Sequence, residues 1–328
     1  MHTGGLDEVK RWVEGAFHHQ EVGREFLSFV YRSTEGNPLF VDQLLRALVE
    51  EGAVWHTGER WEWQPVSELQ VPSSIDALVL RRLGRFPPRA QIALAAAAVL
   101  GREFTAALLG ASGSGTDDDI SAFLTESIAA GFVNRLAPPC EGCAERYEFA
   151  HDRIADVVLS HLSPHRIRRG HERAARALET AGDARTHAGA LEIAVHHDLA
   201  GSAAGAHAAA LVAADHAERV YAHATASELL RLAGRNAGSP AELAAVRTRL
   251  AALAELAGQY DEAEELCDLA IEWYSGQGDQ ARSLTLRSVR ERLRSQLGQP
   301  ARRTLDNLLA LDREAAQHGL DGERVAIL

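Results

Sequence analysis

The chain contains a single lysine, Lys10, in 328 residues. A phosphate-binding loop of the form G-x-x-x-x-G-K-[ST] needs a lysine that reaches the β- and γ-phosphates of a bound nucleotide. The glycine- and serine-rich run at 110–116 has no lysine, and Lys10 has no glycine-rich run around it. The sequence therefore lacks a Walker A motif. We expect no ATP hydrolysis, and no enzyme activity, from this chain alone.

Cysteines and long apolar runs are also scarce. Three cysteines cannot form a disulfide framework, which suits a reducing compartment. No apolar run approaches the ~18 residues that a membrane span needs. Residues 1–12 lack the basic start and apolar core of a signal peptide. With 46% hydrophobic and 24% charged residues, the composition is that of a globular protein. We expect a cytoplasmic location and no membrane partner.

The chain has fewer basic than acidic residues, which gives it a formal net charge of −12. An acidic surface repels a nucleic-acid backbone unless arginines cluster on it. The candidate recognition helix at 116–130 contains no arginine and carries four acids, Asp117, Asp118, Asp119 and Glu126. Direct DNA binding is therefore not expected.

The most informative segment is 34–52, which reads TEGNPLFVDQLLRALVEEG. Its apolar residues recur at helical spacing on one face: Leu39, Phe40, Leu44, Leu45 and Leu48. Pro38 stands at the first helical position, where its missing N–H would be unpaired in any case. Gly52 provides a stop. From the residues alone, this is a capped helix of the core.

The sequence of this segment resembles the lid helix of STAND-type ATPases, which are regulatory proteins with an AAA-like nucleotide-binding module, a winged helix and helical repeats. In that family the proline of a GxP turn lies against the adenine of the bound nucleotide. The resemblance implies Gly36, Asn37 and Pro38 as cofactor-binding residues here. The cofactor would be ADP or ATP in an intact parent protein, with none bound by this chain alone.

A second resemblance lies at 149–152, which reads FAHD. In STAND proteins the histidine after the second wing strand points at the nucleotide β-phosphate and helps to hold the inactive ADP form. The matching residue here is His151. Without the resemblance, a histidine at a strand-to-helix junction is more often a helix cap or a buried polar group.

The predicted fold class is mainly α, in three parts. Residues 1–86 read as a helical lid region with helices at 6–17, 22–32 and 38–51, followed by a short β-hairpin at 54–63. Residues 87–180 follow winged-helix order, with helices at 89–100, 105–109 and 117–130 before strands at 131–136 and 146–149. Ser73 and Ser74 favour the start of a helix at 75–85, and two more helices are expected at 151–162 and 164–179.

Residues 181–328 read as a TPR-like α-solenoid, because a short pattern repeats. Ala226, Ala263 and Ala301 recur at intervals of 37 and 38 residues, each followed by apolar residues four and seven positions later. Small residues permit close helix crossing, and the clearest copy resembles a tetratricopeptide repeat. The three alanines are predicted to occupy equivalent crossings. Such arrays present a concave recognition surface.

Three other motifs have a functional and a structural interpretation. Cys140 and Cys143 form a CxxC, which suggests half a zinc site, a redox dithiol or a variable wing-tip loop. The acids at 117–119 suggest a metal site or ordinary helix N-terminal charges. The tryptophans at 55, 61 and 63 suggest a base-stacking platform or plain hairpin pairs. The structural interpretation is favoured in each case, so no catalytic or metal site is predicted.

The function that these observations favour is the non-catalytic regulatory and sensor portion of a STAND-type signalling ATPase or LuxR-family transcriptional regulator. The resemblance covers about 20–180 by motif and 181–328 by repeat pattern. Its implied partners are a P-loop module, in cis or in trans, and a protein or small-molecule effector on the repeats. The alternatives are a stand-alone winged-helix DNA-binding regulator with a TPR sensor, and a TPR protein-interaction scaffold.

Overall fold

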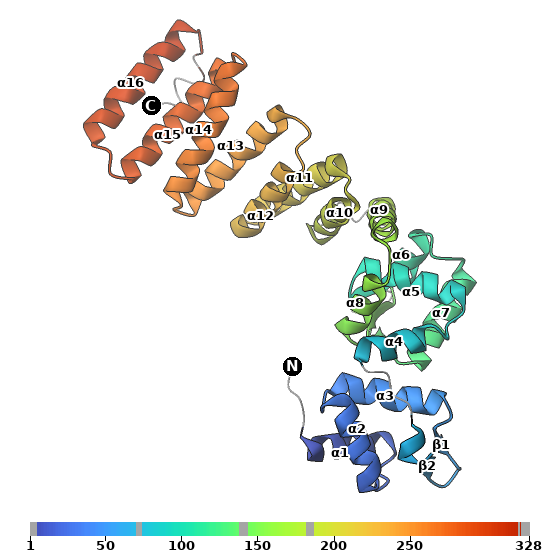
Figure 1. Ribbon diagram of the computed structural model, residues 1–328. Helices are drawn as coiled ribbons and strands as arrows, with labels where there is room; N and C mark the ends of the chain where they lie inside the picture. The colour runs from blue at the N-terminus through green and yellow to red at the C-terminus, as the bar shows by residue number, and fades with distance from the viewer. Residues whose placement is uncertain (1–4, 70–73, 138–143, 182–186, 321, 323–328) are drawn as a thin grey trace. The chain divides into compact units, whose positions relative to one another are not determined.

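The computed structural model describes residues 5–69, 74–137, 144–181, 187–320 and 322. These residues are mostly helical, with two small antiparallel sheets, and the later helices form a solenoid (Figure 1). The mainly α fold class is therefore confirmed. The chain divides into two compact units, residues 1–170 and 171–328. The division into 1–86, 87–180 and 181–328 stays a prediction.

The first unit begins with three helices and a hairpin, as the sequence predicts. They are α1 (Leu6–Ala16), α2 (Arg24–Thr34), α3 (Pro38–Glu50), β1 (Val54–His56), β2 (Trp61–Trp63) and the short 3-10 helix η1 (Val66–Glu68). The strands pair with Trp55 opposite Glu62. Phe26 and Phe17 lie in the shared core, and Trp63 covers Phe26 at 4.7 Å between ring centroids. The tryptophans therefore hold the hairpin against the helices.

A second group of elements follows within the same unit. They are α4 (Ile75–Leu83), α5 (Pro88–Leu100), β3 (Glu103–Thr105), α6 (Ala106–Ala111), α7 (Asp117–Ala129), β4 (Val133–Leu136), β5 (Arg146–Phe149) and α8 (Asp152–Ser160). The sheet order is β3-β5-β4, all antiparallel. Sequence reasoning missed β3, because three residues with one buried side chain, Phe104, give no readable alternation.

Helix α4 belongs to both cores of this unit. Leu78 is buried with the α1–α3 core, whereas Val79 and Leu83 are buried with the α5–α8 core. Adjacent residues on a helix point about 100° apart, so one helix can serve two neighbours. Ser74 caps α4 by accepting a hydrogen bond from the Ala77 N–H at 3.2 Å, as predicted.

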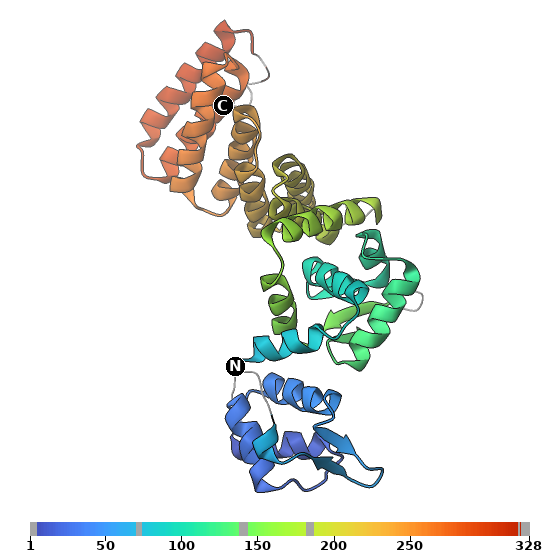
Figure 2. The same cartoon turned by 45° about the vertical axis from the view of Figure 1, so that its right-hand side comes forward.

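The second unit is a stack of antiparallel helices. Helix α9 (Pro164–Ala181) runs into it, and the others are α10 (His187–Ala200), α11 (Ala203–Arg219), α12 (His223–Arg235), α13 (Pro240–Leu256), α14 (Tyr260–Gly276), α15 (Gln280–Gln296) and α16 (Ala301–Gln317). Each helix contacts the next in order from α10 to α16, and α13 to α16 stay side by side in the turned view of Figure 2.

The repeat register is right for two copies and wrong for the third. Ala226 and Ala263 are each the fourth residue of their helix, and both are fully buried. Ala301 is instead the first residue of α16 and is exposed, whereas Thr304 is the buried fourth residue. The α15–α16 turn, through Gly298 and Pro300, shifts the pattern by three residues. Alanine identity alone could not reveal this shift.

Candidate functional site

The Gly-Asn-Pro turn is built by local chemistry. Gly36 is buried and has φ 72°, a left-handed conformation that favours glycine. Asn37 is the N-cap of α3, and its Oδ1 accepts hydrogen bonds from the N–H groups of Leu39 and Phe40 at 3.1 and 3.3 Å. Pro38 is the first helical residue and is exposed. The turn therefore presents the proline ring to solvent at a rigid helix start.

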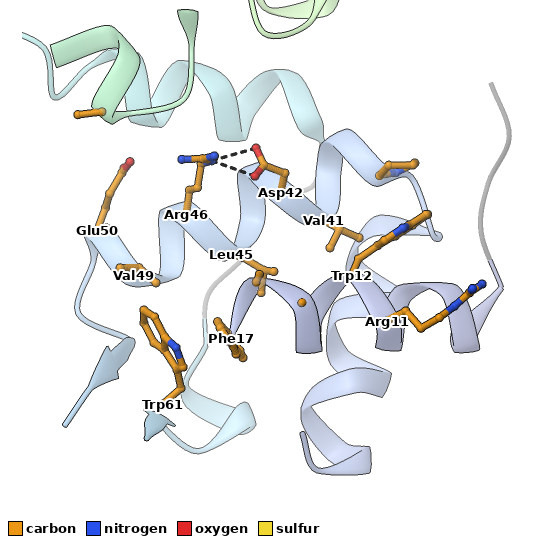
Figure 3. Close-up of a pocket in the computed structure, with 14 residues that line it drawn as sticks. Arg11, Trp12, Phe17, Val41, Asp42, Leu45, Arg46, Val49, Glu50 and Trp61 are labelled. Carbon is orange, nitrogen blue, oxygen red and sulfur yellow. Dashed lines mark hydrogen bonds and ion pairs between the residues drawn. The ribbon is translucent and has the colours of Figure 1, made fainter. Parts of the chain in front are cut away.

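Pro38 lines a pocket of about 840 Å³ formed chiefly by α1 and α3. Its apolar lining comes from both helices and from the hairpin. Figure 3 shows Phe17 and Trp61 facing Leu45 and Val49 of α3. The rings of Phe17 and Trp61 are stacked, with centroids 5.1 Å apart. This pocket adjoins the predicted nucleotide-contacting turn, because Pro38 is one of its lining residues.

The charged groups at this pocket have ion-pair partners, some within the pocket and some outside it. Arg46 donates from Nε to both carboxylate oxygens of Asp42, at 2.9 and 3.0 Å (Figure 3). The guanidinium also covers the backbone of Gly131, where a Cβ would come within 2.5 Å of its central carbon. Arg11 is 3.7 Å from Glu8. A ligand here would meet aromatic and aliphatic walls and a rim of compensated charge.

His151 is the N-cap residue of α8. Its Nδ1 accepts a hydrogen bond from the Arg153 N–H at 3.1 Å. The residue is half-buried, and its Nε2 has no hydrogen-bond partner among the described residues. The capping role that the residues alone suggested is therefore present, and one ring nitrogen remains available. The predicted β-phosphate contact stays a prediction.

Two arginines flank His151, and both are held by carboxylates. Arg153 donates to the two oxygens of Asp76 at 3.0 and 2.6 Å, which ties α8 to the first turn of α4. Arg102 lies 3.4 Å from Asp152 and 3.7 Å from Glu148. Arg102 is the less tightly bound of the two, and its side chain is 63% exposed. It is the arginine here that could turn toward an incoming anion at the smallest cost.

The structure thus brings Gly36, Asn37 and Pro38 together at one turn, and places His151 at a separate helix start in the same unit. His151 does not line the pocket at Pro38. The predicted shared nucleotide contact of Pro38 and His151 stays a prediction.

Sequence reasoning missed a buried arginine at the junction of the two cores. Arg82 of α4 donates to Glu50 and Gln43 of α3 and to the carbonyl oxygen of Ala130. Its guanidinium also lies 4.6 Å from the ring centroid of Phe132. The signal was present in the sequence, because Arg82 follows Leu78 and Val79 at the four- and three-residue spacings of a buried helix face.

The other motifs have ordinary structural roles where they are described. Thr116 and Asp119 form a reciprocal capping box at the start of α7. The hydrogen bonds from Thr116, followed by one from Arg89, lower the pKa of Asp119. Cys140 and Cys143 lie outside the described residues. Within the described part of the chain, no three His, Cys, Asp or Glu side chains form a metal-binding group. No described helix is long and apolar enough to cross a membrane.

The second unit has a pocket of its own, of about 490 Å³, between α13 and α15. Alternate helices of a solenoid line one surface, so a pocket between them is open to a partner. Its lining is mainly small and apolar, with Arg249 and Arg282 at its edge. Arg249 is already bound to Asp215 and Glu218 at 2.6 and 2.9 Å. Arg282 lies 5.4 Å from the Tyr274 ring centroid.

Comparison with known proteins gives little to set beside this geometry. No protein family model matches the sequence, and no curated protein matches it. Among solved structures, the chain is similar to a STAND protein with a tetratricopeptide repeat sensor from Pyrococcus horikoshii, with a TM-score of 0.39 and 11% sequence identity. The alignment covers 98% of this chain and 49% of that protein, so the chain spans about half of its length.

Proposed function

We propose that this chain is the non-catalytic regulatory and sensor portion of a STAND-type signalling ATPase. Residues of the first unit would act as a helical lid followed by a winged helix, and the second unit as a TPR-like sensor arm. The observation that carries the proposal is the Gly36–Asn37–Pro38 turn. It presents an exposed proline at a capped helix start, beside an apolar pocket.

In this proposal the chain supplies contacts to a nucleotide that another module holds. The ring of Pro38 would lie against the base of the nucleotide. This contact is apolar and needs no charged group. The free Nε2 of His151 would meet the β-phosphate as a hydrogen-bond donor. Neither residue cleaves a bond, because the chain has no Walker A lysine to cradle a triphosphate.

Regulation would follow from differential binding. If only the ADP-bound state uses the His151 contact, that contact shifts the population toward the closed, inactive state. An effector on the solenoid would bias the same two-state equilibrium from a second site. We propose the pocket between α13 and α15 as the effector position.

The test measures ADP binding by calorimetry, first for the chain alone and then with a P-loop module supplied in trans. We expect no binding by the chain alone and measurable binding by the pair. Pro38→Ala removes one ring contact to the base, and His151→Ala removes one hydrogen bond to the β-phosphate. Each variant should therefore weaken ADP binding by the two-component complex about tenfold. The matched controls are Pro240→Ala, also a proline at a helix start, and His223→Ala in the second unit.

ADP binding that neither variant changes would remove the proposed site. ATP turnover by the homogeneous chain, abolished by a substitution within it, would remove the non-catalytic assignment.

A TPR protein-interaction scaffold is the second candidate, favoured by the pocket between α13 and α15. It predicts partner binding by the second unit with no dependence on Pro38 or His151. A stand-alone DNA-binding regulator finds less support, because α7 presents acids at 117–119 and Glu126, which repel phosphates. Nanomolar, sequence-specific DNA binding at physiological salt would restore it.

A further inference from the structure

A groove of about 440 Å³ lies in the first unit, between α4, α5, α8 and the start of α9. Its lining contains no carboxylate. The polar lining residues are Gln91, His161 and Arg166, and the others are apolar or glycine. The larger apolar side chains are those of Leu80, Leu83, Ile92, Leu94, Val158 and Leu162. Ile92 is 45% exposed, so the groove presents apolar surface that a partner can cover.

The start of α9, which borders this groove, carries uncompensated positive charge. The segment 164–170 contains Arg166, Arg168 and Arg169 and no acid. All three side chains are exposed, and none of them makes an ion pair or a hydrogen bond within the described residues. They remain free in a chain whose formal net charge is −12. This part of the surface therefore attracts negative charge.

Basic charge at this end of a helix opposes the stability of the helix. The N-terminus of a helix carries a partial positive charge, which acids stabilise and arginines do not. Helices α4, α7 and α8 of the same unit each have at least one acid in the first turn. Helix α9 has none, and its third residue is Arg166. The arrangement disfavours the isolated helix and favours an external anion at its start.

Arg166 and Arg169 lie on the groove side of α9. Arg166 lines the groove, and Arg169 follows it by three residues on the same side of the helix. Arg168 follows Arg166 by two residues, so it points to nearly the opposite side. The helix start is packed closely on α5, because a Cβ at Gly170 would come within 3.0 Å of Cγ2 of Val99. The two arginines and the groove therefore form one continuous surface.

We propose that this groove binds an acidic amphipathic segment of a partner protein. Apolar side chains of that segment enter the groove and contact Ile92, and its carboxylates pair with Arg166 and Arg169. The charges are complementary, because no acid lines the groove to repel such a segment. A nucleic-acid backbone matches this surface less well, since phosphates bring no apolar group and two arginines contact few of them. The proposal concerns the first unit alone and does not depend on the proposed nucleotide contact.

Fluorescence anisotropy of a labelled synthetic peptide, titrated with the full chain, tests the proposal. The peptide has about 14 residues, enough for four helical turns, with leucines on one face and glutamates elsewhere. We expect a dissociation constant on the order of 10–100 micromolar that rises as salt is added. A control peptide has the same composition with its leucines spread around the helix. It should bind at least about tenfold more weakly, because its apolar side chains cannot enter the groove together.

Variants of the chain separate the charged contact from the apolar one. Arg166→Glu should weaken peptide binding about tenfold, because the new carboxylate repels the peptide. Its control is Arg168→Glu, the same charge change on the other side of α9, which should change the binding less than about twofold. Ile92→Ser should weaken the binding about fivefold. Its control is Ile128→Ser, because Ile128 is 39% exposed on α7 and does not line the groove.

Thermal unfolding distinguishes a loss of binding from a loss of structure. Arg166→Glu places an acid in the first turn of α9, so this variant should be at least as stable as the unchanged chain while it binds more weakly. A chain that binds neither peptide overturns the proposal, and so does equal weakening by Arg166→Glu and Arg168→Glu. Tighter binding of a short DNA duplex, sensitive to Arg166→Glu and not to Ile92→Ser, would overturn it in favour of a nucleic-acid site.

Discussion

Arg82 and Glu50 form an ion pair across the junction of the two cores of the first unit. Nε of Arg82 donates to both carboxylate oxygens of Glu50 at 3.1 Å, and Nη2 donates to one of them at 2.5 Å. The Arg82 side chain is 1% exposed and that of Glu50 is 31% exposed. A charge taken so completely out of water needs these partners, and they come from α3 and from the α7–β4 turn.

Replacing Arg82 should therefore destabilise the first unit. For Arg82→Ala we expect a loss of about 3 kcal/mol in the free energy of unfolding, since Glu50, Gln43 and the Ala130 carbonyl all lose their donor. Urea denaturation followed by tryptophan fluorescence measures the loss, because four of the five tryptophans lie in this unit. The neighbouring Arg81→Ala is the control: Arg81 is 40% exposed, so its pair with Glu51 contributes about 0–1 kcal/mol.

Acid should weaken the contact between α9 and α10. His171 and His196 are buried, and their Nδ1 atoms are 2.8 Å apart, so one ring donates to the other only while at least one is neutral. Burial, with His171 and His197 nearby, lowers the pKa of His196 from 6.5 to about 4, and burial also lowers the pKa of His171. The carboxylate of Glu179 binds Nε2 of the neighbouring His197 at 2.9 Å.

Because these pKa values are lowered, the unfolded chain binds protons at a pH where the folded chain does not. Stability is complete above pH 6.5 and falls as the pH drops below 6.5. For His196 the fall continues toward pH 4, with a slope of up to about 1.4 kcal/mol per pH unit. Hydrogen exchange of α9 and α10 amides across this range measures the effect. His196→Gln should flatten the dependence, whereas His216→Gln, on the exposed side of α11, should leave it unchanged. An equally steep dependence in His196→Gln would contradict the assignment.

The corrected repeat register predicts different responses at Ala263 and Ala301. Ala263→Leu should cost about 1–3 kcal/mol, because its fully buried side chain stands at a close helix crossing. Ala301→Leu should change stability by less than about 0.5 kcal/mol, because Ala301 is exposed at the first position of α16. Thermal unfolding of the full chain compares the two. Equal losses would restore the register that the sequence alone predicted.

Cys267 should be chemically inert in the folded chain. Burial, followed by the nearby carboxylates of Asp268 and Glu255, raises the pKa of its thiol to about 12. Thiolate, the reactive form, is therefore almost absent at neutral pH. In a variant with Cys140 and Cys143 replaced by serine, a disulfide reagent such as DTNB should react with Cys267 only after denaturant is added. Rapid reaction without denaturant would show that the α13–α14 contact opens readily.

Local chemistry allowed the helix starts to be predicted closely. Asn37, Ser74 and Thr116 cap α3, α4 and α7 through hydrogen bonds within three residues of the cap. Such contacts depend only on residues that are close in sequence, so they can be predicted without knowledge of the fold. The Gly36–Asn37–Pro38 turn and the helix cap at His151 belong to this class. What those residues bind is a property of a surface, and it stays a prediction.

Contacts between distant residues were decided only by tertiary structure. Arg82 and Ala130 are 48 residues apart in the sequence, and His171 and His196 are 25 residues apart. No periodicity in the sequence predicts that either pair is in contact. The same holds for α16, where the geometry of one turn decided that Thr304, and not Ala301, is buried. For residues 1–180 the sequence by itself indicated which segments are helices and roughly where they begin, and for the rest of the chain it indicated helical repeats. Whether an individual polar or small side chain is buried depends on which other element packs against it. That packing partner is determined by the tertiary fold as a whole.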